Sequence, residues 1–325
     1  MAAIGLFEFA LVLLGFGGAT LPIGLPPLAA DPMVSRAAPD ECLYFSSWNG
    51  TADPDPKSEN LTERLLAEPE VQEFGEQLGK QILQALNTAA QQDPRTQVLA
   101  DAAPGLLKVL ATRPGAVYVA KVVPTPPNVV IEAGLLVCAG KEEPLLREAV
   151  GQLEALLVGA LGDAAHIEQA TIAGVNLKRL APAPDAPVFL WGFKDSNFML
   201  AIGEDEAKAL IGRLQQDHPL PGWLKAAGEK LGSDRPAGIN YINLAGILET
   251  AAPVLTDPST KMALDTLGVS QLKHLISTHG LSGRGTVFRT LVSLSGEPQG
   301  LLKLAPAKAL EADDLQVVPR EATFA

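Results

Sequence analysis

Charge is scarce in this chain, and positive charge is the scarcer sign. Charged residues make up 19% of the 325 residues, with 25 Lys and Arg against 37 Asp and Glu, so the formal net charge is −12. A nucleic-acid-binding protein needs a basic face for the phosphates, and an acidic surface is repelled by anionic lipid headgroups. The composition therefore excludes a nucleic-acid partner. It allows contact with a membrane only through the apolar N-terminal segment, if that segment stays uncleaved.

Sequence motifs for covalent catalysis and cofactor binding are missing as well. There is no Gly-x-Ser-x-Gly nucleophile elbow, no Ser-x-x-Lys with a supporting triad and no phosphate-binding Gly-rich loop with a Lys. Two of the four histidines, His274 and His279, lie five residues apart on an expected strand. That odd spacing places them on opposite faces, so they would not share a metal. The sequence thus predicts no catalytic residue, no cofactor and no metal site.

The chain has two cysteines, Cys42 and Cys138, both in strand-like runs. In an exported protein they could form a disulfide. Closing a loop of roughly 95 residues would then stabilise the fold by up to about 4–5 kcal/mol in the chain-entropy model. Alternatively, they are two small buried hydrophobic residues that never meet.

The N-terminus is predicted to be a targeting segment. Residues Ile4 to Phe16 are apolar apart from Gly5, Glu8 and Gly15, and the run is too short to span a bilayer comfortably. Small residues and a proline-rich stretch follow, which predicts a signal peptide within residues 1–30, cleaved after Ala19 or Ala30. No basic residue precedes the run and Glu8 interrupts it, so an uncleaved anchor and a buried helix are the alternatives.

The rest of the chain alternates between strand and helix patterns. The clearest stretch is residues 187–214, where an apolar run, a polar break at 194–197 and a second apolar run predict a hairpin. Acidic residues at 204–206 then begin a helix whose apolar residues share one face. Residues 71–86 have the same helical periodicity. We therefore expect an α+β fold with antiparallel sheets covered by amphipathic helices.

Two similar lobes are predicted within this fold. The prolines and glycine of 218–222 mark the boundary, which gives a first lobe over 38–217 and a second over 223–310. An Arg-Pro pair before a glycine introduces a strand in each lobe. Residues 311–325 would begin a further, incomplete repeat, because 318–325 is similar to 38–45.

Three residues are candidates for contact with a ligand or partner. Trp48 lies beside an Asn-Gly turn, and Asp53 and Asp55 follow it in an Asp-Pro loop. The acids superficially resemble a calcium loop, but the prolines and the missing glycine rule out the helix-loop-helix type. Tryptophan favours interfaces. Simple packing is the alternative for Trp48, and the sequence favours it.

The run from Ala38 to Thr51, followed by Leu65–Val71, resembles large exported bacterial proteins of unknown function. The resemblance implies a location in the periplasm or cell envelope and an α+β fold, and it carries over no activity. The leading interpretation is a non-enzymatic binding or structural protein that contacts a protein or other envelope component through a sheet face or an interlobe groove. The alternative is an envelope hydrolase whose site combines residues distant in sequence. A deep polar pocket would favour the hydrolase, and a flat apolar patch would favour partner binding.

Overall fold

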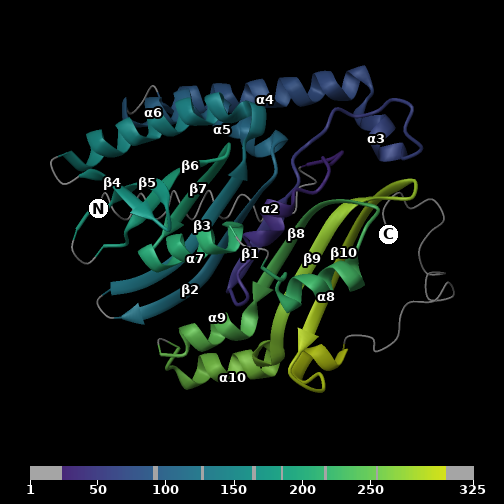
Figure 1. Cartoon of the computed structure of the whole chain (residues 1–325). Helices are drawn as coiled ribbons and strands as arrows, with labels where there is room; N and C mark the ends of the chain where they lie inside the picture. Colours follow the sequence, from purple (N-terminus) through teal and green to yellow (C-terminus); the bar gives the residue numbers. More distant parts are fainter. Residues whose placement is uncertain are drawn as a thin grey trace.

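The computed structural model describes residues 24–304, apart from 91–93, 126–127, 163–165, 184–185, 216–217 and 254 (Figure 1). The predicted targeting segment therefore lies outside the described residues up to position 23. The predicted repeat start at 311–325 lies wholly outside them.

One antiparallel sheet dominates the fold, in the order β10-β9-β8-β1-β2-β3-β7-β6-β5-β4. Its strands are β1 (Tyr44–Trp48), β2 (Gly115–Thr125), β3 (Asn128–Cys138), β4 (Ile167–Ile172), β5 (Val175–Leu180), β6 (Phe189–Lys194), β7 (Asn197–Ile202), β8 (Arg235–Asn243), β9 (Leu272–Ser282) and β10 (Gly285–Leu294). The helices are α2 (Pro32–Arg36), α3 (Leu61–Leu66), α4 (Pro69–Ala90), α5 (Pro94–Thr112), α6 (Glu143–Leu161), α7 (Glu204–Gln215), α8 (Gly222–Leu231), α9 (Leu244–Ala251) and α10 (Pro258–Leu267). The α+β class is as predicted.

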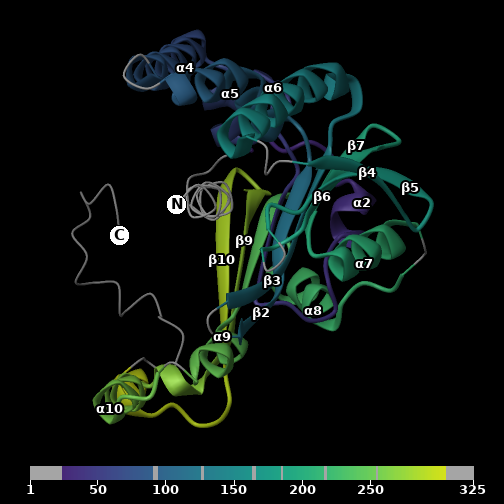
Figure 2. The same ribbon diagram turned by 90° about the vertical axis from the view of Figure 1, so that its left-hand side faces the viewer.

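The two faces of the sheet are covered by different helices (Figure 2). Helices α2, α7 and α8 pack on one face, where Phe45, Tyr118 and Ile276 belong to the core. Helices α5 and α6 pack on the other face over β3 and β4–β7, around Trp191 and Leu146. The core beneath α5 and α6 does not extend to β8–β10.

The hairpin predicted at 187–202 is confirmed as β6–β7, followed by α7. Its turn is made by Asp195 and Ser196, which have φ values of 49° and 60°. Short polar side chains bond the local backbone and tolerate this left-handed region better than branched ones. The acids of 204–206 lie in the first turn of α7, where the helix dipole favours negative charge.

The predicted lobe boundary at 218–222 does not divide the sheet, because strands before and after it belong to the same sheet. Strand β1, from the first predicted lobe, pairs with β2 on one side and with β8, from the second, on the other. Strands β9 and β10 continue from β8. Two similar lobes therefore remain a prediction, and their strands are joined in one sheet.

Helix α4 departs from the expected amphipathic cover. It packs mainly against α5 and α3 rather than on the sheet. Its apolar stripe is exposed at Phe74, Leu78 and Ile82, with 66% of Phe74 accessible. The helix predicted from the periodicity of 71–86 is confirmed as part of α4. The exposed apolar stripe of this helix, however, has no partner among the described residues.

A buried polar cluster holds α7 against the covered face. The Tyr118 hydroxyl donates to Glu206 Oε1 at 2.6 Å, and Arg213 donates to the same carboxylate oxygen at 2.8 Å. Burial raises the pKa of Tyr118 well above its usual range. A Cβ at Gly134 would lie 2.3 Å from the Tyr118 hydroxyl, so the ring needs a glycine opposite it. The cluster is enclosed, and we interpret it as structural.

Both cysteines are free and buried, and burial raises the pKa of each thiol to about 12. Strand register separates the two cysteines. Cys138 follows Val137, which pairs with Gly115 of β2, and Gly115 pairs with Trp48 at the end of β1. Cys42 lies just before Tyr44, at the beginning of β1. At about 3.3 Å per residue this offset far exceeds the Cα spacing of a disulfide. The structure therefore has two separate thiols, in place of the disulfide considered from the sequence.

No helix in the described ranges combines the length and apolar composition needed to span a bilayer.

We expect the native protein to leave both thiols unreacted with Ellman's reagent, because they are buried and protonated at neutral pH. Unfolding in guanidinium without reductant should release two reactive thiols per chain. Finding none after unfolding would show that Cys42 and Cys138 are paired.

Candidate binding surface

The second face of the sheet is left uncovered by the described helices over β1, β8, β9 and β10. Figure 2 shows α5 and α6 over the other half of that face, α4 at one end of β8–β10, and α9 and α10 at the other end. Helix α3 also contacts β10. We call this region the open sheet face.

Strand register arranges the side chains of the open sheet face in three rows. Residues directly opposite in an antiparallel pair lie on the same face. The middle row is polar and crosses four strands through the successive pairs Ser46–Asn240, Asn240–Ser277 and Ser277–Thr290. The Ser46 hydroxyl donates to Asn240 Oδ1 at 2.8 Å, which links the first two members.

The rows on either side are mainly apolar and aromatic. One consists of Trp48, Gly238, His279 and Phe288, and the other of Tyr44, Ile242, Leu275 and Val292. The open sheet face thus has a stripe of neutral hydrogen-bonding groups between two stripes suited to apolar contact. None of these twelve residues is acidic, and the one imidazole is that of His279.

Two glycines allow large rings to lie flat on this surface. A Cβ at Gly115 would be 2.5 Å from the Trp48 ring, and one at Gly238 would be 2.6 Å from the His279 ring. Both rings therefore lie across a glycine of the neighbouring strand. Trp48 is also anchored by its indole, whose Nε1 donates to the Arg113 carbonyl at 2.8 Å.

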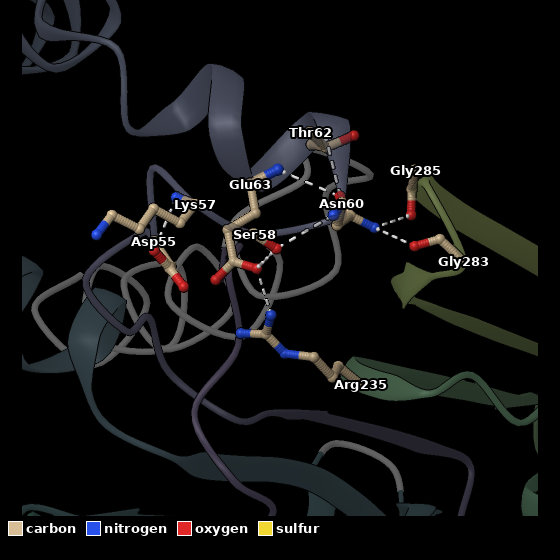
Figure 3. Close-up of polar contacts among 9 residues, drawn as sticks. All are labelled: Asp55, Lys57, Ser58, Asn60, Thr62, Glu63, Arg235, Gly283 and Gly285. Carbon is tan, nitrogen blue, oxygen red and sulfur yellow. Dashed lines mark hydrogen bonds and ion pairs between the residues drawn. The ribbon is translucent and has the colours of Figure 1, made fainter.

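One end of the open sheet face is held by Asn60, the N-cap of α3 (Figure 3). Its Oδ1 accepts from the amide of Thr62 at 3.1 Å, while its Nδ2 donates to the carbonyls of Gly283 and Gly285 at 3.2 and 2.9 Å. One buried amide thereby caps a helix and binds the β9–β10 turn. A backbone bond from Leu61 to the Arg284 carbonyl, at 2.8 Å, adds to the connection.

Glu63 reinforces the same junction (Figure 3). Its Oε2 forms an ion pair with Arg235 at the start of β8 and accepts from the Ser58 hydroxyl at 2.7 Å. The Arg235 guanidinium is the main cause that lowers the pKa of Glu63. Glu63 is buried, whereas Arg235 is partly exposed. The pair ties the segment after β1 to β8.

The three candidate contact residues do not form one site. Trp48 lies on the open sheet face, as described above. Asp53 is exposed in the connector, and Asp55 accepts from the amide of Lys57 at 2.8 Å, which makes it a turn residue. Sequence reasoning missed the polar row, because its members become neighbours only through strand pairing. The expectation that His274 and His279 lie on opposite faces agrees with the structure, since His274 packs near Tyr241 on the covered face.

Within the described ranges, no group of three or more His, Cys, Asp or Glu side chains is arranged to hold a metal ion. Comparisons with protein-family models, with curated proteins and with solved structures found no match to this chain.

We expect Glu63→Gln to lower the free energy of unfolding at pH 7 by about 1–2 kcal/mol, because it removes a charge-assisted contact that solvent at Arg235 partly screens. A carboxyl with a lowered pKa contributes stability that is present above its unfolded pKa, near 4.5, and is lost as the pH falls through its folded pKa. The difference between variant and wild type should therefore shrink below about pH 4.5.

Urea denaturation at several pH values between 7 and 3 checks this expectation. Glu59→Gln is the matched control, because Glu59 lies exposed in the same connector. A deficit for Glu63→Gln that stays constant down to pH 3 would contradict the assignment.

Proposed function

We propose that this protein is a non-enzymatic, exported binding protein of the cell envelope, and that the open sheet face contacts its partner, a protein. The observation that carries the proposal is the part of the sheet that the described helices leave open, with Phe288 and Val292 exposed by 57% and 46% on its edge strand. Exposed apolar side chains that gather on one face mark interaction sites in soluble proteins.

The chemistry of the three rows favours a polypeptide as the partner. Two members of the middle row, Ser46 and Ser277, are buried, whereas the Asn240 amide is partly exposed and the Thr290 hydroxyl is exposed. These two groups can exchange hydrogen bonds with a peptide backbone or polar side chains. The flanking rows supply aromatic and aliphatic contact area, including Trp48, a residue type common at binding hot spots. The net charge of −12 disfavours a polyanionic partner.

Rigidity supports the same interpretation. The face lies on four paired strands, and the contacts of Asn60 and Glu63 fix one of its ends. A surface built on regular strands needs little ordering on binding, which lowers the entropic cost of association.

Cross-linking in envelope fractions identifies the partner. With p-benzoyl-phenylalanine in place of Phe288, we expect a discrete adduct whose second protein is identified by mass spectrometry and then purified. Phe288→Asp should weaken its binding by about 30-fold or more, as removal of a hot-spot residue does. Arg289→Asp, on the opposite face of β10, should change the affinity little. Equal affinities for all three proteins in calorimetry would refute the proposal.

Processing provides a second test. Residues 24–30 pack on the segment after β1, where Ala52 donates to the Pro26 carbonyl at 2.8 Å and Pro27 bridges to Thr51. Cleavage after Ala30 would remove this packing, whereas cleavage after Ala19 would keep it. We therefore expect a mature N-terminus at Thr20 in envelope fractions, read by mass spectrometry. A mature chain starting at Asp31 would contradict this choice, and an intact Met1 in the cytoplasm would contradict export.

A further inference from the structure

The two edges of the sheet are built differently. Among the described strands, β10 and β4 form these edges, and Figure 2 shows β10 outermost, beyond β9. Strand β4 has six residues, and its Glu168 is exposed. Strand β10 has ten residues, no proline and one charged side chain, that of Arg289. Short strands, prolines and charges keep sheet edges from pairing with other chains, so β10 is the less protected edge.

One set of peptide groups along β10 points away from the sheet. Ser282 and Gly285 pair across the two-residue turn between β9 and β10, so they form a hydrogen-bonded pair. Every second residue of β10 from Gly285 onward therefore bonds to β9. The Ser295 amide, which donates to the Gln271 carbonyl at 2.8 Å, agrees with this alternation. The intervening residues direct their N–H and C=O groups outward, among them Phe288, Thr290 and Val292.

The middle of this edge is accessible. At the end next to the turn, the Thr286 hydroxyl donates to that of Thr62 in α3 at 3.1 Å. Beyond that contact, Phe288 and Val292 are half exposed, and Thr290 between them is exposed. An extended polypeptide can therefore add to the sheet along 288–292, where main-chain groups would supply its hydrogen bonds.

The sequence of β10 is complementary to itself in one register. Consider an antiparallel copy of β10 related by a two-fold axis through Thr290. Phe288 then lies opposite Val292 of the partner subunit, and Thr290 lies opposite the partner's Thr290. Aromatic–β-branched and Thr–Thr pairs are both favourable cross-strand neighbours. Because this axis is perpendicular to the sheet, all of these side chains stay on the open sheet face.

Charge selects this register over its neighbour. Axes through Arg289 or Thr290 give the longest overlap of two β10 strands. An axis through Arg289 would set two guanidinium groups directly opposite each other, which destabilises a strand pair. The axis through Thr290 instead sets Arg289 opposite Leu291 of the partner subunit. A second copy thus fits this edge in an arrangement that satisfies backbone, side chains and charge together.

We propose that two copies of this chain pair antiparallel through β10, with the two-fold axis at Thr290, so that their sheets continue into each other. Residues 288–292 of both copies exchange about six backbone hydrogen bonds. The two open sheet faces then form one surface, in which the polar rows meet at Thr290. The dimer does not rest on the proposed function, although it presents the proposed binding surface twice.

Cysteine substitution tests the register in the full chain. Opposite residues of a hydrogen-bonded pair have Cα atoms about 5.5 Å apart, within the range of a disulfide. Thr290→Cys should therefore give a covalent dimer on mild oxidation, read by non-reducing electrophoresis and intact mass. Arg289→Cys is the matched control and should stay monomeric on the gel, because its two Cα atoms would be about 8 Å apart. The native thiols of Cys42 and Cys138 are buried.

Sedimentation velocity over a range of concentrations tests the interface without added cysteine. We expect the wild type to dimerise in the micromolar range. Thr290→Lys sets two like charges at the axis and should raise the dimer Kd about fivefold or more. Gln169→Lys adds the same charge at an exposed position of β4 and should leave the Kd unchanged. Far-UV circular dichroism of both variants checks that the fold is kept.

Several outcomes would overturn the dimer: a monomeric wild type at high micromolar concentration, open-ended oligomers, a Kd that Thr290→Lys leaves unchanged, or faster cross-linking of Arg289→Cys than of Thr290→Cys. These measurements use the protein without any partner, so their failure leaves the proposed function standing. That function fails separately, if a purified partner binds the wild type and Phe288→Asp equally.

Discussion

The fold depends on β1, a five-residue strand that is hydrogen-bonded along both edges. Tyr44 to Trp48 pair in order with Val119 to Gly115 of β2 and with Ile242 to Gly238 of β8. The β8–β10 unit joins the rest of the sheet through this strand. Because a register slip of one residue would turn every side chain of β1 to the other face, the core around Phe45 and the open sheet face depend on the same alignment.

The asymmetry of helix cover gives the protein its candidate surface. One face of the sheet is packed with α2, α7 and α8, while α5 and α6 reach only part of the other. The uncovered part has a polar row that no single segment encodes, since its members come from β1, β8, β9 and β10. A sheet face that is polar only along its centre is suited to a narrow apolar ligand with few polar groups.

The polar groups outside this row have structural tasks. Asn60 and Glu63 fix the helix after β1 to the β9–β10 turn and to β8, and Tyr118, Glu206 and Arg213 hold α7 on the sheet. In each case a buried polar atom is satisfied by a partner distant in sequence, as buried polar groups require. One end of the open sheet face is therefore fixed, which favours a preformed contact surface.

The sequence by itself determined the local features: the β6–β7 hairpin and α7, the α+β class, and the helical periodicity of α4. These follow from short-range turn chemistry, capping and the alternation of apolar residues. It also singled out Trp48, but grouped it with Asp53 and Asp55, which belong to a turn and a connector. The tertiary structure alone decided that strands of both predicted lobes share one sheet, that the apolar stripe of α4 faces no described partner, and that Ser46, Asn240, Ser277 and Thr290 form a row. Strand pairing brings together residues some two hundred positions apart, and no local pattern records that choice.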